Sequence, residues 1–289
     1  MKRTFLIFGC GYTCKFLAIK LIQAGWHVVG TIRSSNNSYQ LNKLGIEPVY
    51  WDDEKKIKAI LSDGCSIINS IPPNNKGDLV FNRYYDYLIS QKEKIDWFGF
   101  LSSTGVYGNK SGNWVTEDSH TKPITENGKL RLKAEENWLK LSRGTNIPVF
   151  IFRIAGIYGP GRSILDRIES GTVEKVVKKD QYFNRIHVED IVGAVGLALE
   201  SPLLQGVYNL SDDMPSSGDV VIDEATRILG LPKIKETLFE NATLSEMAKS
   251  FYEDSKKVSN RKLRQILGYS LKYPTYKSGL VSIFDSTKD

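Results

Sequence analysis

The chain has 289 residues, of which 41% are hydrophobic and 25% are charged, and its 39 Lys and Arg exceed its 33 Asp and Glu by six. This composition, with only 10 Pro, excludes a disordered or low-complexity chain and is typical of a globular protein. Because basic and acidic residues are interleaved along the chain, the positive charge predicts a solvated surface and argues against a nucleic-acid partner.

Apolar runs of strand length alternate with helical patterns over the first two thirds of the chain, which is typical of βαβ units and a parallel sheet. The predicted strands are residues 4–8, 27–32, 48–51, 66–71, 97–102, 148–153 and 207–210. Between the first two, residues 13–24 carry apolar side chains at i, i+3 and i+4, which predicts an amphipathic helix that Gly25 ends. We therefore expect an α/β fold with a doubly wound parallel sheet of seven strands.

The regular alternation breaks after Ile157, where Gly159, Pro160 and Gly161 predict a loop. We expect residues 1–155, completed by residues 186–212, to form the sheet domain. Residues 156–185 and 213–289 then form a smaller lobe over the carboxyl edge of the sheet, where open α/β sheets bind ligands. Within this lobe, the basic stretch 256–264 suggests one exposed helix face.

Three cysteines, Cys10, Cys14 and Cys65, are too few and too scattered for a disulfide framework, which favours a reducing compartment. The three histidines lie far from them and from each other, so we expect no metal site. No apolar run approaches the length of a membrane helix, and the apolar run at the amino terminus is too short for a signal peptide. The chain is therefore predicted to be cytoplasmic, without a membrane partner.

A glycine-rich turn follows the first predicted strand, in the order Gly9-x-Gly11-x-x-Cys14. In dinucleotide-binding proteins the first glycine of such a turn allows the tight bend, and the second lets backbone amides approach a pyrophosphate. The next helix offers free N–H groups and a positive dipole end. The third glycine is replaced here by Cys14. The predicted cofactor contacts are Gly9, Cys10, Gly11, Tyr12 and Thr13, together with Ser70 and Ile71 at the end of the fourth strand.

Arg33 follows the second predicted strand, in the sequence G-T-I-R-S-S. NAD-selective proteins usually carry Asp or Glu at this place, because a carboxylate accepts a hydrogen bond from the ribose 2′-hydroxyl. A guanidinium group instead binds a 2′-phosphate through charge-assisted hydrogen bonds. Arg33 therefore favours NADP over NAD, although an ordinary exposed arginine would also be tolerated at a strand end.

Five motifs in order resemble the extended short-chain dehydrogenase/reductases, a family that includes NAD-dependent epimerases and dehydratases. They are the Gly9 turn, L-S-S-T-G-V-Y-G at 101–108, F-R-I-A-G-I-Y-G-P-G-R at 152–162, R-I-H-V-E-D-I at 185–191 and V-Y-N-L-S-D-D at 207–213. The resemblance implies a Rossmann fold that binds NAD(P) and a smaller lobe that binds substrate.

The resemblance also implies roles for single residues. Ser103 matches the family's catalytic Ser/Thr, and Ile154 lies in the segment near the nicotinamide. Tyr107 and Gly108 match a structural turn. His187 and Asp190 match a motif that docks a late helix on the Rossmann core, so His187 is expected to be structural.

The chain departs from the family at the Tyr-x-x-x-Lys motif, whose tyrosine exchanges the substrate proton. Counting from Pro123 places Asn127 and Arg131 at the Tyr and Lys positions, and an alternative register pairs Lys129 with Lys133. An amide does not titrate near neutral pH, so Asn127 could orient a substrate but not take its proton. Arg131 keeps a positive charge that could hold the nicotinamide ribose. The resemblance thus implies an atypical subgroup without the catalytic tyrosine.

Two classes of function remain open. The first is an NADP-dependent oxidoreductase or epimerase acting on a small carbonyl, hydroxyl or sugar-nucleotide-like substrate, with Ser103 and Asn127 orienting it and Arg131 at the cofactor. Its proton-transfer group would be Tyr158, Glu117 or Asp118. The second is a non-catalytic dinucleotide-binding sensor or regulatory module. A homodimer is an assembly that the sequence leaves open.

Overall fold

The structure is a computed structural model that describes residues 3–288, apart from the side chain of Met247. The chain divides into two compact units. Unit 1 contains Met1–Ser103, Lys129–Arg153 and Val192–Tyr208, and unit 2 contains Thr104–Gly128, Ile154–Ile191 and Asn209–Asp289. Unit 2 therefore includes residues 104–128, a segment that the sequence analysis assigned to the sheet domain.

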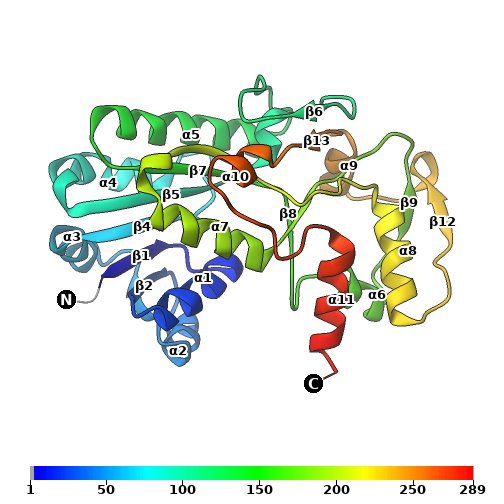
Figure 1. The fold of residues 1–289 in the computed structure, drawn as a ribbon, viewed down its shortest axis with the longest axis horizontal. Helices are drawn as coiled ribbons and strands as arrows, with labels where there is room; N and C mark the ends of the chain where they lie inside the picture. Colours follow the sequence, from blue (N-terminus) through cyan, green and yellow to red (C-terminus); the bar gives the residue numbers. More distant parts are fainter. Residues whose placement is uncertain (1–2, 289) are drawn as a thin grey trace. The chain divides into compact units, whose positions relative to one another are not determined.

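A seven-stranded sheet forms the centre of unit 1, in the order β11-β7-β5-β4-β1-β2-β3 (Figure 1). Its strands are β1 Thr4–Phe8, β2 His27–Ile32, β3 Glu47–Tyr50, β4 Cys65–Asn69, β5 Ile95–Ser103, β7 Val149–Ile154 and β11 Gly206–Leu210. The pairings of β1 with β2 and β4, of β2 with β3, and of β4 with β5 are parallel. The predicted doubly wound α/β fold is confirmed, and the predicted bounds of β1 and β2 are the observed ones.

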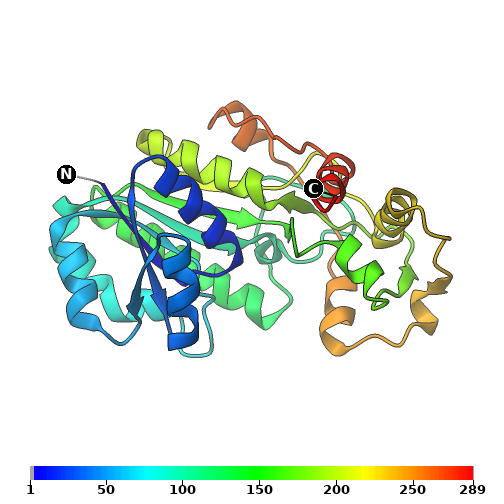
Figure 2. The same ribbon diagram turned by 90° about the horizontal axis from the view of Figure 1, so that it is seen from below.

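Helices cover both faces of this sheet (Figures 1 and 2). They are α1 Tyr12–Gln23, α2 Ser35–Lys43 and α7 Val188–Glu200 on one face, and α3 Glu54–Asp63, α4 Leu79–Ser90 and α5 Glu126–Gly144 on the other. On the second face, buried Ile57, Tyr84 and Trp138 from the three helices join one apolar cluster with Phe98 of β5. On the opposite face, the Trp97 indole nitrogen donates to the Ala198 carbonyl of α7 at 3.2 Å.

Unit 2 contains three two-stranded parallel sheets and five helices among its described residues. The paired strands are β8 Gly156–Tyr158 with β10 Arg185–His187, β9 Lys175–Val177 with β12 Glu236–Leu238, and β6 Trp114–Val115 with β13 Lys257–Val258. The helices are α6 Ile164–Glu169, α8 Gly218–Leu229, α9 Glu246–Tyr252, α10 Arg261–Gln265 and α11 Tyr276–Ser286. Its apolar core joins β8, α6, α8 and α11 through residues such as Tyr158, Leu165, Val221 and Leu280.

The basic stretch 256–264 is not one exposed helix face, so that prediction was wrong. It forms β13 and then α10, and Lys256, Val258 and Leu263 are buried. Val258 pairs with Val115 of β6, and the Lys256 ammonium group bonds to Asp254. Strand pairing and a local ion pair therefore override the charge pattern. None of the helices in residues 3–288 combines the length and the hydrophobicity needed to span a membrane.

Candidate functional site

The turn between β1 and α1 requires glycine at its first position. Gly9 has φ +83°, and a Cβ there would lie 2.8 Å from the Ile71 side chain. The Gly9 amide donates to the Thr31 hydroxyl at 2.9 Å, and the Ser70 hydroxyl donates to the Gly9 carbonyl. Residues from β1, β2 and the end of β4 thus fix the turn, because parallel strands bring their carboxyl ends to one edge.

Gly11 leaves the amino end of α1 open. It is the N-cap of the helix, is exposed, and has no side chain to cap the first N–H groups. No atom lies within 4 Å of the position that a Cβ on Gly11 would take, and the first turn of α1 carries no acidic residue. N–H groups without a side-chain cap, a positive dipole end and room beside Gly11 suit a pyrophosphate. The predicted contacts Cys10, Tyr12 and Thr13 lie in this same turn.

Cys14 occupies the third fingerprint position as a small buried side chain. Burial raises the pKa of its thiol to about 11 and that of Cys10 to about 12. Both groups are therefore protonated thiols at neutral pH. Cys14 packs where glycine usually allows close contact of helix and strand, so the replacement preserves a tight βα junction.

Ser70 and Ile71 continue directly from β4 beside the Gly9 turn. The Ser70 amide donates to the Phe8 carbonyl at 2.9 Å, and the Ile71 amide donates to Asn69 Oδ1 at 3.0 Å. The Asn69 side chain is itself held by the buried carboxylate of Asp78 at 3.0 Å. Burial raises the pKa of Asp78, and its hydrogen bonds oppose that shift.

Arg33 is exposed directly after β2. Ser34, the next residue, is the N-cap of α2, and the first turn of that helix contains no acidic residue. Arg33 makes no hydrogen bond or ion pair with the described residues that would neutralise its charge. The guanidinium group, the Ser34 hydroxyl and the helix amides are chemically suited to a phosphate.

At the end of β5, Ser103 is half-buried, whereas the preceding Ser102 is buried and donates to Glu135 of α5. Arg131, one turn before Glu135, donates from Nη1 to the Leu101 carbonyl at 2.9 Å. Burial lowers the pKa of Arg131. Nη1 of Arg131 therefore stabilises the end of β5. The contact of Arg131 with the nicotinamide ribose remains a prediction.

Asn127 is exposed in the first turn of α5. Its neighbour Gly128 packs closely against the turn after β5, since a Cβ there would lie 3.0 Å from the Gly105 carbonyl oxygen and 2.8 Å from Pro123 Cβ. Lys129 and Lys133 of the alternative register are exposed as well. Gly128 therefore packs against the turn after β5, while the side chain of Asn127 is exposed.

The three predicted proton-transfer groups have different environments. The Tyr158 hydroxyl donates to the Thr275 carbonyl at 3.5 Å, and burial raises its pKa far above the neutral range. Glu117 accepts from the Asn209 amide at 2.8 Å, and burial raises the pKa of its carboxyl. Asp118 is exposed. Tyr158 therefore remains a neutral donor, whereas the raised pKa of Glu117 favours proton exchange by its carboxyl group.

The motif residues expected to be structural have structural contacts. His187 is 1% exposed, accepts from the Glu189 amide at 3.2 Å, and has its pKa lowered by burial to about 4. Asp190 accepts from the amides of Lys272 and Tyr273. Tyr107 donates to Asn209 Oδ1 at 2.7 Å. Ile154, which was expected to lie near the nicotinamide, is buried at the end of β7, and its contact with the cofactor remains a prediction.

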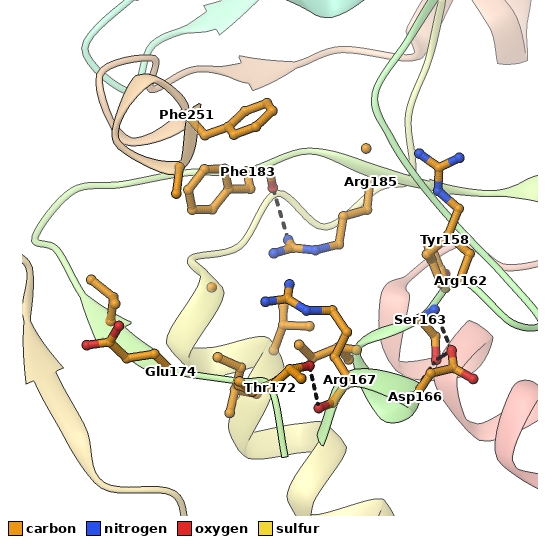
Figure 3. Close-up of a pocket in the computed structure, with 18 of the residues that line it drawn as sticks. Tyr158, Arg162, Ser163, Asp166, Arg167, Thr172, Glu174, Phe183, Arg185 and Phe251 are labelled. Carbon is orange, nitrogen blue, oxygen red and sulfur yellow. Dashed lines mark hydrogen bonds between the residues drawn. The ribbon is translucent and has the colours of Figure 1, made fainter. Parts of the chain in front are cut away.

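Unit 2 also contains an open cavity of about 780 Å³, which was not predicted from the sequence. Arg162, Arg167 and Arg185 all line it, beside the aromatic residues Phe183 and Phe251 (Figure 3). Arg162 and Arg185 belong to two separate sequence motifs, whereas Arg167 lies in α6 and Phe251 in α9. No sequence pattern links these segments. The sequence feature that could have indicated the cavity is the presence of an arginine in each of two motifs, Arg162 in G-P-G-R and Arg185 in R-I-H-V-E-D-I.

Local structure explains how the cavity is built. Gly159 and Arg162 exchange backbone hydrogen bonds across a turn in which Gly161 has φ +68°, and this turn places Arg162. Ser163 and Asp166 then form a capping box that starts α6. Arg185 lies on β10 opposite Gly156 of β8.

Comparisons with known proteins agree with this fold. No protein-family model matches the chain. Protein YeeZ of Escherichia coli strain K12 is 27% identical over 287 residues, covering 95% of this chain and 97% of YeeZ. A functionally unknown conserved protein from Silicibacter pomeroyi DSS has a solved structure that is 35% identical, with a TM-score of 0.92 and all of both chains covered. The chain therefore belongs to one family with that protein.

More distant structural neighbours include epimerases and a dehydratase solved with NAD. UDP-glucuronic acid 4-epimerase from Bacillus cereus, in complex with NAD, has a TM-score of 0.76 at 20% identity and covers 99% of this chain and 96% of the epimerase. At this identity the likeness shows the shared fold of NAD-dependent epimerases and dehydratases.

Proposed function

We propose that the protein is an NADP-dependent oxidoreductase or epimerase of the extended short-chain dehydrogenase/reductase type. Its substrate would be a small molecule with a carbonyl, a hydroxyl or a sugar-nucleotide-like group. The observation that carries this proposal is the open amino end of α1 at Gly11, beside a Gly9 turn fixed by three strands. The NAD complexes of the structural neighbours support a nicotinamide dinucleotide.

Two features of this chain would hold the cofactor. The amides of the Gly9 turn and of α1 would bind the pyrophosphate, and Gly11 leaves room for it. Arg33 would bind the 2′-phosphate, since its charge is exposed and no acidic residue lies in the first turn of α2. When bound, the nicotinamide supplies hydride transfer.

Ser103 and Asn127 would orient the reacting oxygen. Ser103 offers a hydroxyl at the end of β5, where the carboxyl ends of parallel strands meet. Asn127 offers an amide that donates and accepts hydrogen bonds without titrating. Arg131 would add a positive charge near the ribose while its Nη1 stays on the Leu101 carbonyl.

Proton transfer then needs a group other than the family's tyrosine. We assign it to Glu117, because a carboxyl group whose pKa is raised by burial can exchange a proton near neutral pH. The neighbouring carboxyl group of exposed Asp118 is the alternative. Tyr158 can donate a hydrogen bond, but its raised pKa opposes formation of a tyrosinate.

The second candidate function is a non-catalytic dinucleotide-binding sensor. The chain has no Tyr between Tyr107 and Tyr158, and exposed Asn127 would stand where the family has its acid. A sensor would retain the Gly9 turn and Arg33 while losing the proton-transfer group.

One experiment separates the two candidates. NADPH binding is first measured by nicotinamide fluorescence, and NADPH oxidation is then followed over a broad panel of carbonyl compounds and nucleotide sugars. An enzyme oxidises NADPH with at least one compound, and Ser103→Ala lowers that rate without changing NADPH affinity. Submicromolar NADPH binding without turnover over the whole panel supports the sensor. Absence of NADPH binding contradicts both.

A further inference from the structure

We propose that the cavity of unit 2 binds the phosphate of a phosphomonoester, held between Arg185 and Arg167. Binding of this group is a property of unit 2 alone. Only the identification of the phosphomonoester as the substrate rests on the proposed function.

The cavity is large and formed entirely by unit 2. Its volume of about 780 Å³ exceeds what a phosphate alone fills, so it has room for the organic part of a ligand. Figure 3 shows the side chains of Arg185 and Arg167 both extending into it, in the same direction. Phe183 and Phe251 lie on the same side of Arg185 and offer apolar surface.

Arg185 is held so that part of its guanidinium group remains available. Its Nη1 donates to the carbonyl oxygens of Phe183 at 3.2 Å and Ser216 at 3.0 Å. The Phe183 and Tyr276 rings lie 6.0 and 5.9 Å from its guanidinium carbon. Two backbone carbonyls and two rings thus hold the side chain, while the group still lines the cavity.

The charge of Arg185 lacks a carboxylate partner within ion-pair distance among the described residues. The neighbouring carboxyl of Asp212 is 1% exposed, its Oδ2 has no hydrogen-bond partner in the described part of the chain, and burial raises its pKa to about 7. Asp212 therefore compensates Arg185 only in part at neutral pH. A largely buried cation is costly unless an anion pairs with it, which points to an anionic ligand.

The cavity wall carries an excess of positive charge. Arg162, Arg167 and Arg185 face two acidic residues, Asp166 and Glu174. The Asp166 carboxylate is already engaged, since it accepts from the Ser163 amide at 2.6 Å and from its hydroxyl at 2.7 Å. Three arginines and two carboxylates leave the lining with a net positive charge.

A phosphomonoester suits this arrangement better than other anions. It concentrates two negative charges on one tetrahedral group, and two guanidinium groups can contact that group together through their planar N–H donors. A dicarboxylate separates its charges, and a nucleoside diphosphate adds a base whose polar edges need partners of their own. The rings of Phe183 and Phe251 can pack against the carbon atoms of a compact organic part such as a pentose.

The test is calorimetric titration of the full chain at pH 8.0, with NADP⁺ present so that the phosphate contacts of the cofactor are filled. NADP⁺ binding is measured first, so that a failure of the proposed cofactor site is seen separately from a failure of the phosphomonoester site. If NADP⁺ does not bind, the titrations are repeated with Arg33→Gln, which removes the other expected phosphate contact. The probes are inorganic phosphate, ribose 5-phosphate, uridine diphosphate, uridine and succinate. The variants are Arg167→Gln, Arg185→Lys and, as a control outside the cavity lining, exposed Arg227→Gln.

We expect saturable binding of phosphate and tighter binding of ribose 5-phosphate. Arg167→Gln should weaken both by about tenfold, as expected for loss of a charge-assisted contact. Arg185→Lys, which keeps the charge but removes the planar donors, should weaken both as well, and Arg227→Gln should leave both unchanged. Equal losses in all three variants, binding of uridine alone, or succinate binding as tight as that of ribose 5-phosphate would each overturn the proposal.

Discussion

Glu135 of α5 and Arg153 of β7 form a buried ion pair next to Ser102, near the carboxyl end of β5. Arg153 Nη2 donates to Glu135 Oε2 at 2.8 Å, and Nε donates to both carboxylate oxygens at 3.1 and 3.2 Å. The side chains are 1% and 7% exposed. Ser102, next to Ser103, also donates to Glu135. The pair therefore holds the strand end that carries the proposed substrate-orienting serine.

Removing one partner of this pair should destabilise the fold strongly. Glu135→Leu or Arg153→Met should each lower the free energy of unfolding by about 3–5 kcal/mol, because an uncompensated charge stays buried. The double variant should recover much of that loss. Urea denaturation monitored by tryptophan fluorescence measures all three. A double variant as unstable as the sum of the single variants would show that the charges do not depend on each other.

A methyl group on Gly11 should weaken cofactor binding without destabilising the fold. Gly11→Ala adds a methyl group in open space, so the unfolding free energy should change by less than about 1 kcal/mol. NADPH affinity should fall by about tenfold or more, because the methyl group blocks the approach of the pyrophosphate. Gly144→Ala, also in open space but at the end of α5, is the matched control and should change neither quantity appreciably. Unchanged NADPH affinity in Gly11→Ala would place the pyrophosphate elsewhere.

His187 should make the protein sensitive to mild acid. Its pKa is lowered from 6.5 to about 4 in the folded state, so the unfolded chain takes up a proton between these values and the folded chain does not. Stability is therefore lost as pH falls through this window. Relative to His187→Gln, the wild type should lose about 2 kcal/mol between pH 7.5 and 5.0. Denaturant titrations of both proteins at the two pH values measure this difference, and parallel pH profiles would contradict it.

Much of the sheet could be predicted from the sequence, because buried parallel strands are nearly continuous apolar runs. The bounds of β1 and β2 were predicted without error, while β4 ends at Asn69, two residues before the prediction. The turn there follows from the Asn69 side chain, which bonds to the Ile71 amide. The short strands of unit 2 escaped prediction, because pairs such as β6 and β13 depend on residues far apart in the sequence.

The candidate sites likewise include one part that could be predicted from the sequence and one that could not. The Gly9 turn is a local feature, since its spacing and its preceding strand are visible in the sequence. The arginines of the unit 2 cavity come together only through tertiary packing: Arg162 depends on a glycine turn, Arg167 on a capping box and Arg185 on strand pairing. No single spacing encodes that meeting.

The most direct test of the account is the ratio of the NADPH and NADH dissociation constants, measured by fluorescence titration for the wild type, Arg33→Asp and the exposed control Lys20→Gln. The wild type and the control should prefer NADPH. Arg33→Asp should weaken NADPH by at least about tenfold and leave NADH nearly unchanged, because the aspartate repels only the 2′-phosphate. Equal losses for the two cofactors, or a wild type that binds neither, would contradict the proposed NADP site.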